Sequence, residues 1–191
     1  MTLSRVYKGE AVVLHSLLMG EADLLVTLWA QTEGKLRAIA KGARKPSSRM
    51  VGHLEPLTRV DLALTRRHGL AVVTQVQVIE SFQPLKGKLE SLSQGFYVSE
   101  LVNGFTAEGL PNAPLYTLLL DTLRLLPHTS KPQILMCYFE LHLLKTSGFM
   151  PELYRCVVCS IRLTPGEHRF SPGAGGTLCV GCAPTEVGIM S

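Results

Sequence analysis

Four cysteines in the last quarter of the sequence have the spacing of a metal site. Cys156 and Cys159 form one Cys-x2-Cys pair, and Cys179 and Cys182 form a second pair after an intervening stretch of 19 residues. Two thiolates three residues apart on a tight turn can point at one ion, and two such turns complete a tetrahedron with Zn–S bonds of about 2.3 Å. Four sulfur ligands leave no position for water or substrate. The spacing therefore predicts one structural Zn²⁺ ion.

Two disulfide bonds are the alternative use of these cysteines. We favour the metal because the sequence shows no export signal and both pairs are spaced like metal-binding turns. A thioredoxin-like redox motif would need a βαβ context, which the sequence does not predict. His168 lies in the intervening stretch and is expected to be a surface residue. The fifth cysteine, Cys137, lies in an apolar segment and is expected to be an inert, packed thiol.

Basic residues are concentrated in the N-terminal part of the sequence. Nine of the 19 Lys and Arg residues lie between positions 35 and 67, together with two of the 15 acidic residues, while the whole chain has a net charge of +4. A one-sided positive field of this kind attracts a polyanion. The candidate DNA-binding residues are Lys35, Arg37, Lys41, Arg44, Lys45, Arg49, Arg66 and Arg67.

The densest basic segment, residues 40–49, is rich in Gly, Pro and Ser and is predicted to be a loop. It lacks the Gly-x4-Gly-Lys-Ser/Thr frame of a P-loop, so nucleotide hydrolysis has no support. The functional hypothesis is contact with nucleic-acid phosphates, and the alternative is an ordinary solvated loop. No Phe, Tyr or Trp lies between Trp29 and Phe82. Base stacking is therefore expected to be minor, which suits a protein that holds phosphates and does not read sequence.

The sequence shows no catalytic constellation. The six histidines are scattered without spacing to a nucleophile. Glu21 and Asp23 are interpreted as turn residues and not as an acid pair. His15 lies in an apolar segment and is expected to be a core histidine. We predict that the protein is not an enzyme. A metal-dependent nuclease or hydrolase would need an open metal site with His or carboxylate ligands, which four thiolates do not provide.

Strand patterns dominate the first part of the chain. Five segments rich in Val and Leu, at residues 11–18, 24–30, 35–40, 58–65 and 70–79, are separated by turn residues. In the last of them, Val72, Thr74, Val76 and Val78 are expected to share one face. Five short strands in about 80 residues suggest a small barrel like that of the oligonucleotide-binding fold, because a closed sheet leaves no long exposed edge.

Helical patterns follow from Pro84 onward. Large apolar residues recur at spacings of four, three and four (Leu85, Leu89, Leu92 and Phe96). Residues 115–126 and 132–146 form two further apolar segments, and the second begins with Pro132 and stops before Gly148. This last segment is apolar around most of its circumference, so we expect it to be the central buried helix.

The composition is that of a folded globular protein, with 46% hydrophobic and 18% charged residues. The longest apolar stretches, residues 11–19 and 115–126, are shorter than the roughly 20 residues that span a bilayer. We expect a cytoplasmic protein with no membrane partner.

Several of these features occur together in an order that resembles the RecO family of bacterial DNA recombination mediators. The matching stretches are Gly20-Glu21-Ala22-Asp23, Ala40-Lys41-Gly42-Ala43-Arg44-Lys45, Gly52-x-Leu54-Glu55-Pro56, Gly148-Phe149-x-Pro151-x-Leu153-x2-Cys156-x2-Cys159 and Phe170-Ser171-x3-Gly175-Gly176-x2-Cys179-x2-Cys182. The Gly-Phe-x-Pro segment joined to the paired Cys-x-x-Cys motifs is the most specific of these.

The resemblance implies a multidomain α+β protein. Its parts would be an N-terminal OB-fold β-barrel that binds DNA at residues 1–82, an α-helical domain at 83–148, and a four-cysteine zinc-finger module at 149–191. Family members continue with further helical sequence, whereas this chain ends nine residues after Cys182. We therefore expect that a C-terminal helical extension is missing.

The resemblance also implies a function without enzymatic turnover. A family member would bind single- and double-stranded DNA, anneal complementary strands and, with RecR, help RecA load onto strands coated by single-strand-binding protein, in the bacterial cytoplasm near the nucleoid. Lys41, Arg44 and Lys45 fall on the basic loop of the family and inherit a role in DNA contact. The alternative function is a zinc-ribbon transcription or translation factor that binds RNA or DNA.

Overall fold

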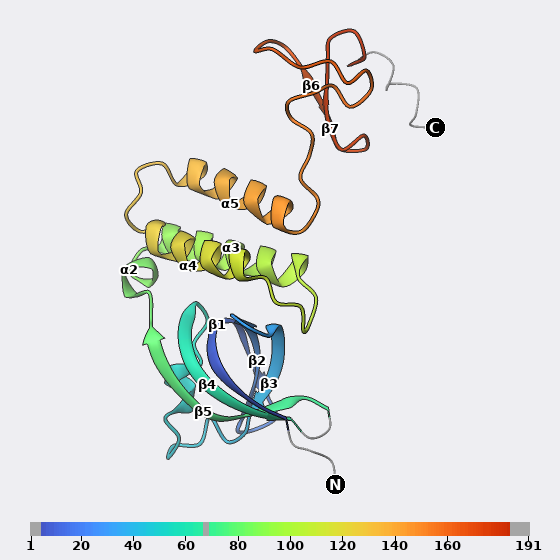
Figure 1. Cartoon of the computed structure of the whole chain (residues 1–191). Coiled ribbons are helices and arrows are strands. Elements are labelled where there is room, and N and C mark those ends of the chain that lie inside the picture. The colour runs from blue at the N-terminus through green and yellow to red at the C-terminus, as the bar shows by residue number, and fades with distance from the viewer. Residues whose placement is uncertain (1–4, 67–68, 184–191) are drawn as a thin grey trace. The chain divides into compact units, whose positions relative to one another are not determined.

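The computed structural model describes residues 5–66 and 69–183. The chain divides into two compact units, Met1–Ser147 and Gly148–Ser191, and each is described here by itself. The larger unit contains a β-barrel and a layer of helices, and the smaller unit contains a two-stranded sheet (Figure 1).

Five strands form the closed barrel of the larger unit, in the order β1-β2-β3-β5-β4. Their bounds are β1 Arg5–Met19, β2 Asp23–Ala30, β3 Gly34–Ala40, β4 Thr58–Arg66 and β5 Ala71–Glu80. Neighbouring strands are antiparallel except β3 and β5, which are parallel. A short helix, α1 (Met50–His53), lies between β3 and β4. All five strands predicted from the sequence are confirmed, and β1 is longer than predicted.

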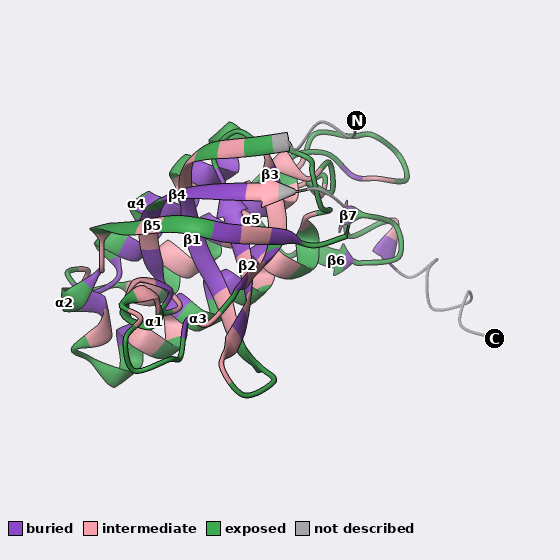
Figure 2. Ribbon diagram, turned by 90° about the horizontal axis from the view of Figure 1, so that it is seen from below, coloured by how far each residue is buried: buried purple, intermediate pink, exposed green. Residues whose placement is uncertain are grey.

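Alternation along the strands fills the barrel. On β2, Leu24, Val26 and Leu28 belong to the inner core, whereas Leu25 and Thr27 are half-buried on the outer face. This period of two is the geometry of an extended chain with one face toward a core. Buried residues accordingly follow the barrel strands, and the loops that join them are largely exposed (Figure 2).

The alternation predicted for β5 is wrong. Val73 is buried in the barrel core, and Val76, three residues further along, packs against the same core, so Val72 and Val76 do not share a face. The reason is a register shift, in which Leu64 of β4 pairs with Val73 but its neighbour Ala63 pairs with Gln75. Thr74 is the extra residue, and its Oγ1 donates a hydrogen bond to the Ala63 carbonyl at 3.0 Å. A β-bulge of this kind exchanges the faces of the residues that follow it.

Strand β1 is buried on both of its faces. Ala11 and Val13 belong to the barrel core, whereas Val12 and Leu14 belong to a second core shared with the helices. Trp29 of β2 is buried in the same second core. The barrel and the helices of this unit are therefore joined by one continuous apolar cluster.

The helical layer contains α2 (Gln83–Lys86), α3 (Leu89–Phe105), α4 (Ala113–Leu125) and α5 (Pro132–Thr146) (Figure 1). Helix α4 begins at Asn112, whose side chain accepts a hydrogen bond from the Leu115 N–H at 3.0 Å, the standard N-cap arrangement. Gly148 follows the end of α5 with φ +80°, a left-handed conformation that favours glycine. The helices predicted at residues 115–126 and 132–146 are confirmed, and α5 has the predicted bounds. The single helical pattern predicted from Leu85 to Phe96 is wrong, because Leu85 belongs to α2 and the chain starts a new helix, α3, at Leu89, which is 84% exposed.

Helix α5 is not the central buried helix that its composition predicts. Phe139 and Leu143 are its buried residues, whereas Ile134 is 64% and Tyr138 52% exposed. Cys137 is exposed as well, so the expectation of a packed thiol is wrong. Helix α4 contributes most to the shared core, because one side of it packs toward the barrel and it also contacts α3 and α5. Apolar composition alone does not distinguish a central helix from an outer one.

The smaller unit has little apolar core. Strands β6 (Arg169–Ser171) and β7 (Gly176–Leu178) pair antiparallel, and the buried cluster consists of Cys156, Leu178 and Ala183. Such a segment cannot be held together by apolar burial alone. In the described part of the chain, no helix has the length and apolar character that crossing a bilayer requires.

Removing a side chain from the shared core should destabilise the larger unit. Leu119 of α4 is fully buried in this core. We expect Leu119→Ala to lower the free energy of unfolding in urea by about 2–5 kcal/mol, through lost burial and the cavity left behind. The matched control is Leu125→Ala on the same helix, where the side chain is 53% exposed. Equal effects of the two substitutions would contradict the shared core.

Candidate metal centre and nucleic-acid interface

The structure brings the four predicted cysteine ligands together. The sulfur atoms of Cys156, Cys159, Cys179 and Cys182 all lie within 4.8 Å of one another. The Cys159 and Cys179 sulfurs are 3.7 Å apart. A tetrahedron of sulfurs bound at about 2.3 Å from a central ion has edges of about 3.8 Å. The four thiols, none of them in a disulfide, therefore have the donor chemistry and spacing to hold one metal ion.

Each Cys-x2-Cys pair lies on a hydrogen-bonded turn. In the first, the Ser160 N–H donates to the Cys156 carbonyl at 2.8 Å, and in the second, the Cys182 N–H donates to the Cys179 carbonyl at 3.0 Å. Strand β7 links the two turns, because the Val157 N–H donates to the Thr177 carbonyl at 3.0 Å, two residues before Cys179. His168 is half-buried, with its Nε2 2.6 Å from the Thr164 carbonyl, and it does not belong to the cluster of thiols.

Two glycines allow this approach. Gly175 has φ +73°, which favours glycine, and Gly176 lies against Glu152 and Val157. A Cβ on Gly176 would lie 2.5 Å from the Glu152 carbonyl oxygen and 2.7 Å from a Val157 methyl group. Only a residue without a side chain fits there, so the glycine pair lets β7 reach the first cysteine turn.

The thiols differ in acidity. Hydrogen bonds from the backbone N–H groups of Cys159 and Cys179 stabilise the Cys156 thiolate and lower its pKa to about 6. The pKa of Cys182 is raised, because its hydrogen bonds with the Cys179 and Cys159 sulfurs favour the protonated form. Without a metal, Cys182 therefore keeps a proton that an ion has to displace.

The basic loop, defined as residues 41–49, is attached to the turn between β1 and β2. The Gly42 N–H donates to the Asp23 carboxylate at 2.7 Å, and the Arg44 N–H donates to the Ala22 carbonyl at 2.9 Å. Arg44 Nη1 also donates to the Glu21 carbonyl at 3.2 Å. Asp23 is the first residue of β2, and its carboxylate holds the basic loop against the turn that precedes it. Two motifs separated by about twenty residues in the sequence thus form one hydrogen-bonded structure, with Gly42 at φ +64°.

The cations of the basic loop are exposed and unpaired. These cations are Lys41, Arg44, Lys45 and Arg49. Within the described residues, no carboxylate oxygen lies within 4.0 Å of their charged nitrogens, and the same holds for Arg37. Lys86, in contrast, pairs with Glu55 at 3.4 Å. Charges without a protein partner remain available to an external anion.

The other predicted DNA-binding residues lie in different settings. Arg37 is exposed on the outer face of β3, whereas Lys35 donates its Nζ to the Asn103 carbonyl of α3 at 2.6 Å. Arg66 is the last residue of β4. Arg67 lies outside the described residues. The structure therefore brings together the cations of the basic loop, whereas the ammonium group of Lys35 already makes a hydrogen bond within the protein.

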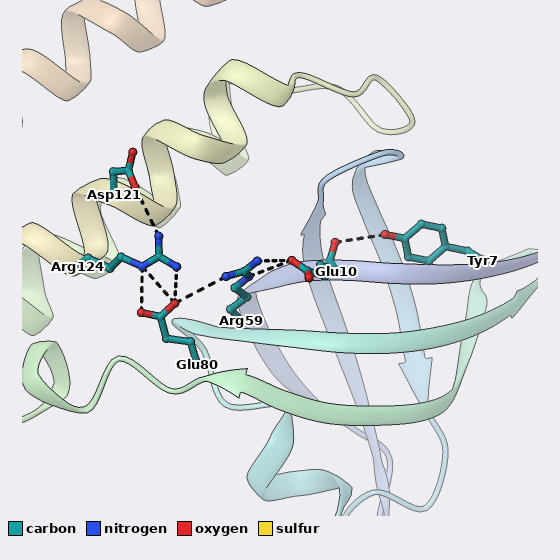
Figure 3. Close-up of polar contacts among 6 residues, drawn as sticks. All are labelled: Tyr7, Glu10, Arg59, Glu80, Asp121 and Arg124. Carbon is teal, nitrogen blue, oxygen red and sulfur yellow. Dashed lines mark hydrogen bonds and ion pairs between the residues drawn. The ribbon is translucent and has the colours of Figure 1, made fainter.

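An ion-pair network at the junction of barrel and helices has no signal in the sequence. Arg59 of β4 pairs with Glu10 of β1 and lies 4.0 Å from Glu80 of β5, while Arg124 of α4 binds Glu80 at 2.7 Å (Figure 3). Arg124 also contacts Asp121 at 3.5 Å. The partners are far apart in sequence, so no local pattern predicts them. Arg59, although it lies in the basic segment, is thereby committed to the fold.

Comparison with known proteins places these features in a family. The family model described as recombination protein O N terminal matches residues 1–82, and that described as recombination protein O C terminal matches residues 87–190. The chain is 39% identical over 182 residues to DNA repair protein RecO of Roseiflexus sp., covering 95% of this chain and 64% of that protein. It is 34% identical over 189 residues to DNA repair protein RecO of Dehalococcoides mccartyi, covering 99% of this chain and 75% of that protein.

Both relatives are named DNA repair protein RecO. The chain belongs to the RecO family. It spans about two thirds to three quarters of the length of these curated relatives. Membership of this family favours DNA repair over the alternative of a zinc-ribbon transcription or translation factor.

The metal centre can be tested by metal content. We expect purified protein to carry one metal ion per chain and Cys179→Ser to lose most of it, because three thiolates leave the tetrahedron open. The measurement is mass spectrometry of the metals in the desalted protein. Cys137→Ser is the matched control, since this cysteine lies outside the cluster. Unchanged metal content in Cys179→Ser would contradict the four-ligand site.

Metal affinity should rise with pH. At neutral pH, Cys156, with a pKa of about 6, is already mostly thiolate, whereas Cys182, with a raised pKa, keeps its proton. Metal binding must release the Cys182 proton, and below pH 6 it must also displace a proton from Cys156. We expect the apparent affinity to fall about tenfold per pH unit for each displaced proton. Competition with a chromophoric chelator measures it, and a pH-independent affinity would rule out thiolate ligation.

Proposed function

We propose that the protein is a recombination mediator of DNA repair that binds single- and double-stranded DNA and anneals complementary strands without catalytic turnover. One observation carries this proposal: the unpaired, exposed cations of the basic loop, held in place by the turn between β1 and β2. Membership of the RecO family supports it.

The barrel would be an oligonucleotide-binding fold. Such folds are five-stranded barrels that bind nucleic acid on the face of their second and third strands and on the adjoining loops. Here β3 presents Arg37 on its outer face and leads directly into the basic loop. The proposed parts are residues 1–82 for DNA binding, 83–148 for the helical domain and 149–191 for the metal module.

Annealing follows from charge. Two strands repel each other through their phosphates, and a surface of cations that binds phosphates lowers this repulsion while releasing counterions. Cations alone distinguish no sequence, and they leave the bases free to pair. Lys41, Arg44, Lys45 and Arg49 would make the phosphate contacts, with Arg37 and Lys35 on the adjoining strand.

The ion would be zinc in a structural role. Thiolate ligands in a tetrahedron suit Zn²⁺, and a closed set of four leaves no position for water or substrate. Because the smaller unit has little apolar core, ligation would supply most of its folding free energy, on the order of 10–16 kcal/mol in comparable peptides. Cys156, Cys159, Cys179 and Cys182 would hold the ion and the two turns together.

The proposed partners follow from the family. With RecR, the protein would help RecA load onto single strands coated by single-strand-binding protein, in the bacterial cytoplasm close to the nucleoid. These partners rest on family membership and not on a particular contact surface of this chain.

The DNA-binding role can be tested with a pair of double variants. We expect Arg44→Ala with Lys45→Ala to slow annealing of complementary oligonucleotides and to reduce the salt dependence of single-strand binding by about 0.7 in log–log slope for each lost phosphate contact. The matched control removes two exposed charges at the ends of α5, Lys131→Ala with Lys145→Ala. Annealing that is absent in the unaltered protein, or equal in both double variants, would contradict the proposal.

A further inference from the structure

The first cysteine turn of the smaller unit folds the chain back on itself as an arginine hairpin, defined as residues 154–163. Arg155 and Arg162 lie directly opposite each other across this hairpin, as an antiparallel pair. The residues on either side of them are joined by backbone hydrogen bonds of 2.9 and 2.8 Å. The two arginines are therefore a non-hydrogen-bonded pair, the kind in which the Cα atoms are only about 4.5 Å apart and the side chains lie closest together.

Both arginine side chains lie on the face of the hairpin that points away from the thiols. Successive residues of an extended chain alternate between two faces. Cys156, which follows Arg155, is buried, and Leu163, which follows Arg162, packs against the same small cluster. Arg155 and Arg162 themselves are exposed. The two guanidinium groups are therefore accessible to a partner in solution.

The two positive charges of the hairpin have no acidic partner. Within the described residues, neither guanidinium group makes an ion pair or a side-chain hydrogen bond. Like charges directly opposite each other destabilise a pair of strands. Glu10 and Asp61 also lie opposite each other, on β1 and β4, but there Arg59 pairs with Glu10. For the two arginines, an external anion would supply the missing compensation.

Charged side chains on the larger unit show the contrast. His15 is half-buried, with Nε2 3.5 Å from the Glu100 carboxylate, and is not the core histidine that the sequence suggests. Arg124 binds Glu80 at 2.7 Å. The cations of the basic loop, like the two arginines of the hairpin, have no such partner among the described residues. Unpaired cations therefore occur on both units of the chain.

A structural role beside the metal is the alternative for this pair. Four thiolates around one divalent ion leave a net negative charge, which attracts cations. The alternation along the chain, however, places the guanidinium groups on the face opposite the buried Cys156. The metal content of variants without the arginines distinguishes this alternative from the binding of an external anion.

We propose that the arginine hairpin is a second phosphate-binding surface, which holds one DNA strand while the basic loop holds another. This inference rests on the proposed strand annealing. A guanidinium group presents its N–H donors as a planar fork that matches two oxygens of a phosphate, so arginine suits this partner better than lysine does. Annealing needs two strands on one protein, and two surfaces on one chain raise the effective concentration of the second strand.

The test uses two strands that cannot pair with each other. One oligothymidylate carries a donor fluorophore and the other an acceptor, so energy transfer reports a protein that holds both. We expect this signal from the unaltered protein. Arg155→Gln with Arg162→Gln should weaken capture of the second strand about tenfold and reduce its salt dependence by about 1.4 in log–log slope, through two lost phosphate contacts. Binding of a single strand should stay unchanged, because the basic loop is intact.

Three matched variants separate the pair from net charge. Arg169→Gln removes an exposed arginine of the same unit whose strand partner is Leu178, and it should leave the two-strand signal close to that of the unaltered protein. Arg155→Lys with Arg162→Lys keeps the charge but not the forked donors, and should recover part of the signal. Arg44→Ala with Lys45→Ala should weaken the binding of a single strand.

Metal content and thermal unfolding test the structural alternative. Removing one of two facing like charges relieves their repulsion. We therefore expect Arg162→Gln to keep one metal ion per chain and, without DNA, to unfold at the same or a higher temperature than the unaltered protein. Loss of the metal or a lower unfolding temperature would assign the pair to the metal-bound fold and overturn the proposal.

The remaining outcomes distinguish this proposal from the proposed function. Failure to bind any strand would overturn the proposed DNA binding itself. Binding of single strands without energy transfer, or an equal loss of energy transfer in Arg169→Gln, would leave DNA binding intact and overturn the role of the hairpin. Labelled polyglutamate that is released by Arg155→Gln with Arg162→Gln, with the two-strand signal unchanged, would assign the pair to an acidic protein instead.

Discussion

Burial of β1 on both faces is the interaction on which the larger unit depends. Ala11 and Val13 fill the barrel, and Val12 and Leu14 fill the core shared with the helices. Apolar burial contributes about 25 cal/mol per Å² on each face, so barrel and helices stabilise each other and unfold as one structure. The ion pairs of Arg59 and Arg124 favour one orientation of the helices against the barrel, because charged groups near the surface contribute specificity more than net stability.

The two units obtain their stability from different sources. Apolar side chains hold the larger one, whereas the smaller one converges on four sulfurs around a small cluster that includes Leu178. This division also separates functions. The four thiols would shape the fold of the smaller unit, whereas the proposed contact with DNA rests on the cations of the larger one.

Sequence reasoning succeeded where a feature depends on neighbours along the chain. Cysteine spacing, the positions of the five barrel strands, and the Pro132 and Gly148 helix boundaries are local signals, and the structure confirms them. It failed where the feature depends on distant partners. The bulge at Thr74 arises from the register of β4 against β5, the exposure of α5 arises from where its neighbours lie, and the pairing of Arg59 joins residues 49 positions apart.

The hydrogen bond from Gly42 to Asp23 would affect the rate of the proposed DNA binding as well as its strength. A free loop would have to lose backbone entropy each time it met a strand, at roughly 1–2 kcal/mol for every residue it orders. This loop is already folded, so in the proposed complex a strand would meet a preorganised set of charges and no slow ordering step would be needed. The Asp23 carboxylate lies in the most basic region of the protein, where its negative charge would repel DNA phosphates. Its hydrogen bond to Gly42 would offset this repulsion by holding the loop in one conformation.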